Sequence, residues 1–140
     1  MLLVDASAFI DAHRRSTGLR EQRCREVLLR VGAVERLGVC GVTAQEVLAG
    51  ARNDENAERL TRQLAAFHVE LATTDDHIEA AAILRRLRAV GLTIGNADTL
   101  VIATTRRTGA RVLATDRDFE RARALVEFPL VFVEGETGGG

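Results

Sequence analysis

The chain has 140 residues, a length that fits one domain, and 46% of them are hydrophobic and 28% charged, as in ordinary globular proteins. At this length folding buries roughly two-thirds of the unfolded chain's surface, so the fold requires no disulfide or metal. The formal net charge of −1 excludes a basic nucleic-acid coat, although all 19 positive residues are arginines, which suit phosphate recognition.

Two features of the sequence predict the compartment. Cys24 and Cys40 form neither a C-x-x-C pair nor a metal-finger pattern with histidine, which favours two core thiols in a reducing cytoplasm. No stretch approaches the length of an apolar membrane span, and the N-terminus lacks the basic and apolar regions of a signal peptide. We therefore expect a soluble, cytoplasmic protein.

The first predicted elements are a strand, two helices and a second strand. Residues 2–4 are a short apolar run that predicts a buried strand, and Ser7 is suited to cap the helix that follows. Apolar residues at i, i+3, i+4 and i+7 from Cys24 to Val31 predict one face of the next helix. Residues 38–42, brief and apolar, predict the second strand.

The middle of the chain is predicted to be mainly helical. Thr43 followed by Glu46 is a capping-box pattern that predicts a helix start, and helical apolar spacing continues through a second helix. Residues 68–73 predict a third strand. A long helix is predicted to begin at Asp75 or Asp76.

Glycines separate the elements of the last third. Gly91 is expected to end the long helix, a turn at Gly95 precedes another helix, and Gly109 ends that one. The remaining predicted elements are a strand at residues 112–114, a short helix at 119–125, a strand at 130–133 and a flexible glycine-rich tail at 135–140. The alternation predicts one α/β domain, residues 1–134, with helices on both faces of a parallel sheet.

Four acids fall at corresponding places on this frame. Asp5 and Asp116 follow the first and fourth predicted strands, Glu46 lies just after the second, and Asp98 lies near a helix start. Ligands of such sheets bind beyond the carboxyl ends of the strands, so we expect the four acids to meet there. If Glu46 or Asp98 is considered alone, a role at the N-terminus of its helix explains the residue as well as a role in a ligand site does. A carboxylate at the end of a buried strand, such as Asp5, is costly without a partner.

Clustered carboxylates favour a bound cation. Two of them about 4 Å apart repel by roughly 4 kcal/mol at an effective dielectric constant near 20. Oxygen ligands suit Mg²⁺, or Mn²⁺ as a substitute, rather than Zn²⁺. Such an ion activates water and neutralises charge on a phosphate, so the chemistry needs no nucleophilic side chain. The sequence offers no convincing Ser-His-Asp or Cys-His set.

Four segments, in this order, resemble the motifs of PIN domains. They are V-D-x-S at residues 4–7, T-A-Q-E at 43–46, A-D-x-x-x-I-A at 97–103 and T-D-x-D-F at 115–119. Order and spacing match from residue 2 to about 133, and the size is similar to that of bacterial VapC toxins. The resemblance implies a five-stranded parallel sheet in the order 3-2-1-4-5.

The resemblance also implies activity and partners. It implies a Mg²⁺-dependent endoribonuclease that cuts tRNA or rRNA, usually as a homodimer. A cognate VapB-type antitoxin would cover the active site with its C-terminal segment, and the helix pair at residues 43–67 would help to form its groove. By position, the catalytic and metal-binding acids would be Asp5, Asp98, Asp116 and, directly or through water, Glu46.

Accessory residues follow from the same positions. Ser7 and Thr115 correspond to small hydroxyl residues beside the metal. Asp118 either binds metal through water or only caps the helix after it. Asn96 is an accessory candidate, although a turn position explains it as well. Four arginines are candidates for binding RNA at the rim of the site: Arg14, Arg15, Arg20 and Arg117. A position on a solvated helix face explains each of them as well.

Two other functions compete with this hypothesis. A haloacid-dehalogenase-like phosphatase also has an aspartate after its first strand, but it needs a second aspartate where this chain has Ser7. A non-catalytic PIN-fold binding or scaffold protein is the second alternative, and it need not bind metal. A dinucleotide-binding module is excluded, because no G-x-G-x-x-G follows the first strand.

Overall fold

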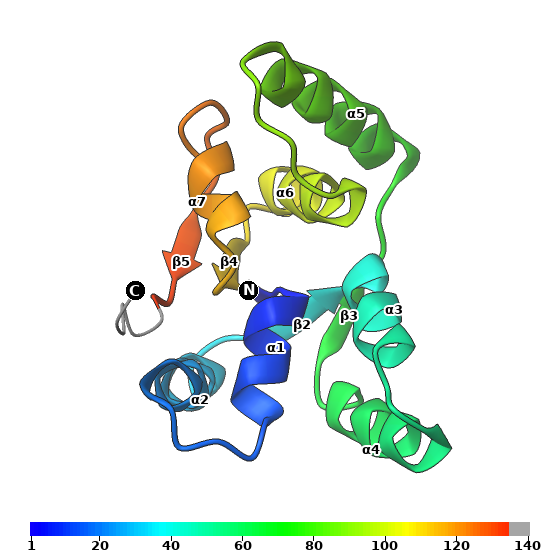
Figure 1. The fold of residues 1–140 in the computed structure, drawn as a ribbon, viewed down its shortest axis with the longest axis vertical. Helices are drawn as coiled ribbons and strands as arrows, with labels where there is room; N and C mark the ends of the chain where they lie inside the picture. Colours follow the sequence, from blue (N-terminus) through cyan, green and yellow to red (C-terminus); the bar gives the residue numbers. More distant parts are fainter. Residues whose placement is uncertain (135–140) are drawn as a thin grey trace.

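The structure is a computed structural model that describes residues 1–134, so the predicted tail at 135–140 lies outside the described residues. A central parallel sheet lies between two layers of helices (Figure 1). The strands are Leu2–Val4 (β1), Leu37–Cys40 (β2), His68–Glu70 (β3), Arg111–Ala114 (β4) and Leu130–Phe132 (β5). The helices are Ala6–His13 (α1), Leu19–Gly32 (α2), Gly41–Ala49 (α3), Asp54–Leu64 (α4), Thr74–Ala89 (α5), Asn96–Thr108 (α6) and Arg117–Ala122 (α7).

The strand order is β3-β2-β1-β4-β5, and every neighbouring pair is parallel. This confirms the predicted order. Strand β1 pairs with β2 on one side and β4 on the other, with Leu3 opposite Gly38 and Val112. The chain order therefore reverses at β1, and the carboxyl ends of β1, β2 and β4 lie side by side. That edge is where ligands bind in such sheets.

Alternate residues of the central strands build two separate cores. Leu2 and Val4 face a cluster with apolar residues of α1 to α4, whereas Leu3 and Val112 face one with residues of α5 to α7. Figure 1 shows these two helix groups on opposite sides of the sheet. Near-continuous apolar strands such as Leu2–Val4 are expected where both faces are covered.

Several helix starts differ from the predictions. Asp5, not Ser7, caps α1, since its side chain accepts a hydrogen bond from the Ser7 amide. The predicted capping box at Thr43 is wrong, because the chain enters α3 directly from β2 and Thr43 is buried inside the helix. The cap of α5 is Thr73, whose hydroxyl accepts from the Asp76 amide.

Two expectations about smaller features hold. Cys24 and Cys40 are free and buried, as predicted for core thiols. Gly109 ends α6 with a φ of 71°, a left-handed conformation in which a side chain would be strained. Within residues 1–134, no helix combines the length and apolar character required to cross a membrane.

Candidate metal centre

Asp5 lies directly after β1 and is only 4% exposed. Its Oδ2 atom accepts hydrogen bonds from the Ser7 hydroxyl at 2.8 Å and the Ser7 amide at 3.2 Å. Burial raises the pKa of Asp5, the Ser7 hydrogen bonds oppose that rise, and the charge of Asp116 adds to it. The helix cap therefore fixes the direction of a carboxylate that burial alone would disfavour.

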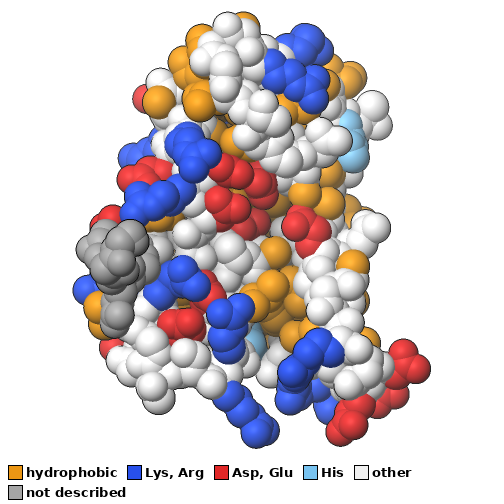
Figure 2. Space-filling model, in the orientation of Figure 1, with side chains coloured by type: hydrophobic (Ala, Val, Ile, Leu, Met, Phe, Trp, Pro, Cys, Tyr) orange, Lys and Arg blue, Asp and Glu red, His pale blue; other side chains and the backbone are white. Residues whose placement is uncertain are grey.

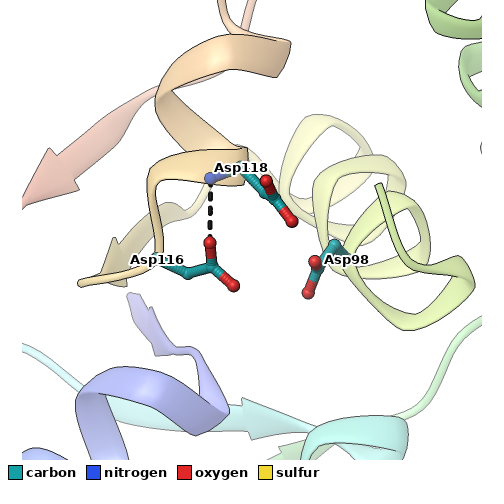
Figure 3. A group of neighbouring side chains, drawn as sticks. All are labelled: Asp98, Asp116 and Asp118. Carbon is teal, nitrogen blue, oxygen red and sulfur yellow. Dashed lines mark hydrogen bonds between the residues drawn. The ribbon is translucent and has the colours of Figure 1, made fainter. Parts of the chain in front are cut away.

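Asp116 and Asp118 flank the start of α7. The turn from β4 into this helix consists of Thr115 and Asp116 alone. Asp116 caps the helix, since its Oδ1 accepts a 2.9 Å hydrogen bond from the Asp118 amide. Of the two roles left open for Asp118, the helix cap is therefore excluded, because Asp116 fills it. The Asp118 carboxylate instead accepts a 3.0 Å hydrogen bond from Arg121 and points toward Asp98 (Figure 3).

Asp98 lies in the first turn of α6 and completes the group. Asp98, Asp116 and Asp118 each offer a carboxylate oxygen, and these three oxygens all lie within 4.8 Å of one another. Figure 3 shows the three side chains pointing toward a common space between α6 and α7. These three residues are called the acidic triad below.

Asp5 and Glu46 lie close to the acidic triad without belonging to it. Burial raises the pKa of Asp98 to about 7, with further contributions from the charges of Asp5, Asp116, Glu46 and Asp118, in that order. Partial burial and the charge of Asp5 raise the pKa of Glu46, which lies on α3. Five carboxylates from four segments of the chain therefore influence one another electrostatically at one edge of the sheet.

The chemistry of this donor set fits a hard divalent cation. Within the described residues the triad offers only oxygen ligands, with no cysteine or histidine among them. The raised pKa values of Asp5, Glu46 and Asp98 mean that burial and neighbouring acids disfavour the charged form of these three carboxylates. A divalent cation between them would remove that penalty. Carboxylate oxygens at this spacing suit Mg²⁺ or Mn²⁺.

The sequence model of the PIN-domain family matches residues 2–125. The chain belongs to the PIN-domain family. The haloacid-dehalogenase-like alternative is therefore wrong, and Ser7 serves here as a hydrogen-bond donor to Asp5. No curated protein matches this PIN domain by sequence similarity.

Solved structures share the fold of this PIN domain at low sequence identity. A chain of VapBC2 from Rickettsia felis, bound to a promoter DNA fragment, matches with a TM-score of 0.77 at 14% identity, covering 94% of this chain and 97% of that one. A chain of VapBC-1 from nontypeable Haemophilus influenzae matches with a TM-score of 0.74 at 17% sequence identity, and the match covers 94% of this chain and 96% of that one. VapC20 from Mycobacterium tuberculosis is a toxin that cleaves the sarcin–ricin loop. It matches with a TM-score of 0.68 at 16% sequence identity, and the match covers 87% of this chain and 95% of that one.

The predicted accessory residues of the PIN domain take different places. The Ser7 hydroxyl contacts Asp5, as described above. The Thr115 hydroxyl donates a 2.9 Å hydrogen bond to Asp11. Asn96 is the exposed first residue of α6, and its carbonyl accepts from the Thr99 hydroxyl at 2.8 Å.

Sequence reasoning missed Asp11, which is buried on α1. Its partners are Thr115, 104 residues away, and Arg20 on the next helix. Such separations leave no local pattern by which the sequence could have indicated the contact. Arg20, predicted at the rim, instead lies with its Nε 2.9 Å from Oδ2 of Asp11.

The other predicted rim arginines differ in how they are paired. Arg117 contacts Glu120 at 3.3 Å and Glu134 at 3.0 Å, so its charge is already compensated. Arg14 lies 3.7 Å from Asp11. Within residues 1–134, Arg15 has no ion pair and lines a groove beside the centre.

That groove, of about 670 Å³, separates α1 from the α3–α4 pair and is called the arginine groove below. Its floor is apolar and its rim carries guanidinium groups, and Figure 2 shows arginines on both sides of a hollow next to the acids. The lining residues are Ile10, His13, Arg14, Arg15, Val47, Gly50, Arg52, Asn56, Arg59, Leu60 and Gln63.

Proposed function

We propose that this PIN domain is an endoribonuclease that requires a divalent cation and acts as the toxin of a toxin–antitoxin pair. The observation that carries the proposal is the convergence of Asp5, Glu46, Asp98, Asp116 and Asp118 at one edge of the sheet. Structural ion pairs hold acids next to basic groups, whereas the raised pKa of Asp98 is caused by burial and other acids. Such an arrangement is typical of a functional site.

The acidic triad would hold Mg²⁺, or Mn²⁺ in its place, as its oxygens suggest. When bound, such an ion lowers the pKa of water and neutralises charge on a phosphate. Asp5, fixed by Ser7, borders the same space and would position a ligand water or the ion itself. Glu46 is exposed and would orient water on the α3 side.

The chain's own groups favour attack by water over attack by a side chain. Burial raises the pKa of Cys24 to about 11 and that of Cys40 to about 12, so both thiols stay protonated. A protonated, buried thiol is a poor nucleophile. Asp98, with a pKa of about 7 in the absence of cation, would release its proton when the ion binds.

The substrate and partner are proposed from the neighbours and the arginine groove. VapC20 cleaves a structured RNA, and other structural neighbours are toxin–antitoxin complexes. Guanidinium groups above an apolar floor fit RNA phosphates beside unstacked bases. We expect a VapB-type antitoxin to cover this groove and thereby exclude RNA. A homodimer and a cytoplasmic location are part of the same proposal.

The test is cleavage of total cellular RNA by the purified, antitoxin-free protein with Mg²⁺, with Mn²⁺ and with EDTA. Asp5→Asn and Asp116→Asn test the centre, and Asp75→Asn, an exposed acid in the first turn of α5, is the matched control. Discrete fragments that need metal, persist with Asp75→Asn and vanish with the other two variants would support the proposal.

The second candidate, a non-catalytic scaffold, predicts a different result. Absence of cleavage with every cation, combined with absence of Mn²⁺ binding in calorimetry, would favour the scaffold. Absence of cleavage with intact Mn²⁺ binding would instead indicate a narrow RNA target missing from the sample. In that case synthetic tRNA and rRNA hairpins are the next substrates.

A further inference from the structure

Asp11 is a buried acid that the proposed chemistry does not use. It lies on α1 and is only 4% exposed. Its Oδ2 accepts the hydrogen bond from the Thr115 hydroxyl at 2.9 Å and lies 2.9 Å from Nε of Arg20 on α2. Its Oδ1 lies 3.4 Å from a terminal nitrogen of Arg20. Arg20 thus compensates the charge of Asp11, Arg14 lies 3.7 Å from its Oδ1, and Thr115 donates a hydrogen bond to its Oδ2.

Thr115 connects Asp11 to the acidic triad. It is the residue before Asp116 in a two-residue turn between β4 and α7. Both its polar donors bind α1, because the hydroxyl reaches Asp11 and the amide donates to the Ser7 hydroxyl oxygen at 3.1 Å. The Ser7 hydroxyl in turn donates to Asp5. Hydrogen bonds therefore link Arg20 and Asp11 to Thr115, and Thr115 through Ser7 to Asp5, whereas Asp116 is joined to Thr115 by the peptide bond.

Asp116 itself has little packing to hold it, since its side chain is exposed. Its position relative to Asp98 and Asp5 depends on the main chain of the turn. Partners that orient metal ligands from behind commonly change metal affinity when they are mutated. A buried, charge-compensated acceptor on the rigid α1 is well placed for that role.

We infer that Asp11 is a positioning residue for the metal centre: with Arg20 as its counter-ion, it holds Thr115 and thereby places the Asp116 carboxylate opposite Asp98. The inference rests on the proposed function, because it takes Asp116 to be a metal ligand. It also assigns Arg20 to this network rather than to the RNA rim.

The experiment measures Mn²⁺ affinity by calorimetry, with Mn²⁺ alone as the probe, together with thermal unfolding in EDTA. Asp11→Ala and Thr115→Val each remove one end of the hydrogen bond, and Thr115→Ser restores the hydroxyl. We expect the dissociation constant to rise roughly tenfold in the first two variants and to stay within about twofold in Thr115→Ser. The double variant should bind no more weakly than the worse single one, since both changes delete the same contact.

The matched control is Asp76→Ala, which removes another buried acid that pairs with an arginine, at the start of α5. It should lower the unfolding temperature and leave Mn²⁺ affinity unchanged. A purely structural role for Asp11 would give the same result as this control, and that outcome overturns the inference. The inference is also overturned if the Mn²⁺ dissociation constant of the double variant rises by the product of the two single-variant increases. If Asp11→Ala does not fold, Thr115→Val and Thr115→Ser decide alone.

Failure of this inference is distinguishable from failure of the proposed function through Asp116→Asn. If Asp116→Asn weakens Mn²⁺ binding while Asp11→Ala and Thr115→Val do not, only the positioning role is overturned. If Asp116→Asn also binds Mn²⁺ like the wild type, Asp116 is not a ligand, and both proposals fall.

Discussion

The Asp118 amide donates a 2.9 Å hydrogen bond to Oδ1 of Asp116, so one carboxylate both caps α7 and faces Asp98. The start of this helix and the geometry of the acidic triad are therefore determined by the same side chain. Asn is as good a helix cap as Asp, whereas Ala is a poor one. The two contributions of Asp116 can thus be separated by substitution.

Asp116→Asn should keep the helix cap and lose the anionic ligand. We expect thermal stability in EDTA to be unchanged or higher and Mn²⁺ affinity to fall by at least tenfold, measured by calorimetry. Asp116→Ala should show the same loss of affinity and a further loss of about 1 kcal/mol of unfolding free energy. Equal stability of the Asn and Ala variants would contradict the capping role.

The raised pKa of Asp98 predicts how pH affects the metal-free protein. The pKa of Asp98 is about 7 in the folded state against its ordinary value of 3.8, so between these two pH values the folded state holds a proton that the unfolded state has released. This stabilising contribution is complete below about pH 4 and is lost as pH rises toward 7.

Asp98→Asn cannot ionise and should lose less stability than the wild type between about pH 5 and pH 8. Because one pKa unit corresponds to about 1.4 kcal/mol, we expect a difference of roughly 1–3 kcal/mol. Urea unfolding in EDTA at both pH values measures it, and Asp75→Asn is the control. Parallel pH profiles for Asp98→Asn and the wild type would contradict the raised pKa.

Cation binding should depend on pH for the same reason. An ion must displace the proton of Asp98, so apparent Mn²⁺ affinity should fall as pH drops below about 7 and should level off above it. Calorimetry in two buffers of different ionisation enthalpy also measures the proton released. Affinity that does not change from about pH 5.5 to pH 8 would argue against Asp98 as a ligand.

Asp76 tests the stability of the fold away from the centre. It is 2% exposed, its Oδ2 accepts from the Thr73 amide in the capping box of α5, and both its oxygens accept from Arg107. Asp76→Ala should cost roughly 2–4 kcal/mol, because it breaks a buried ion pair and a helix cap together. Urea unfolding measures the loss, and Asp75→Ala beside it should lie within about 0.5 kcal/mol of the wild type.

The arginine groove predicts a salt-dependent contribution to RNA cleavage. Arg15→Gln and Arg59→Gln remove guanidinium groups from opposite sides of the groove, on the segment after α1 and on α4. We expect KM to rise several-fold with kcat nearly unchanged, and the dependence of kcat/KM on salt concentration to become weaker. Arg85→Gln, an exposed arginine on α5, is the control. Unchanged KM in both groove variants would remove this groove from the RNA path.

The sequence by itself determined the frame and the main acids. Apolar runs such as Leu2–Val4 indicate buried parallel strands, because both faces of the sheet are covered. The ordered motifs around Asp5, Glu46, Asp98 and Asp116 identified the family and with it the strand order, which the structure confirms. Both kinds of information are local, because an apolar strand and each of the four motifs consist of residues that are close together in the sequence.

Only the tertiary structure decided which side chains meet. It placed Asp118 in the acidic triad with Asp98 and Asp116, although local spacing left a capping role open. It also joined Asp11 to Thr115 across 104 residues, a contact that no local pattern encodes. The physical reason is that a carboxylate at the end of one strand acquires its partners from neighbouring strands and helices. Those neighbours are set by the crossover connections of the sheet and by the packing of helices on its two faces.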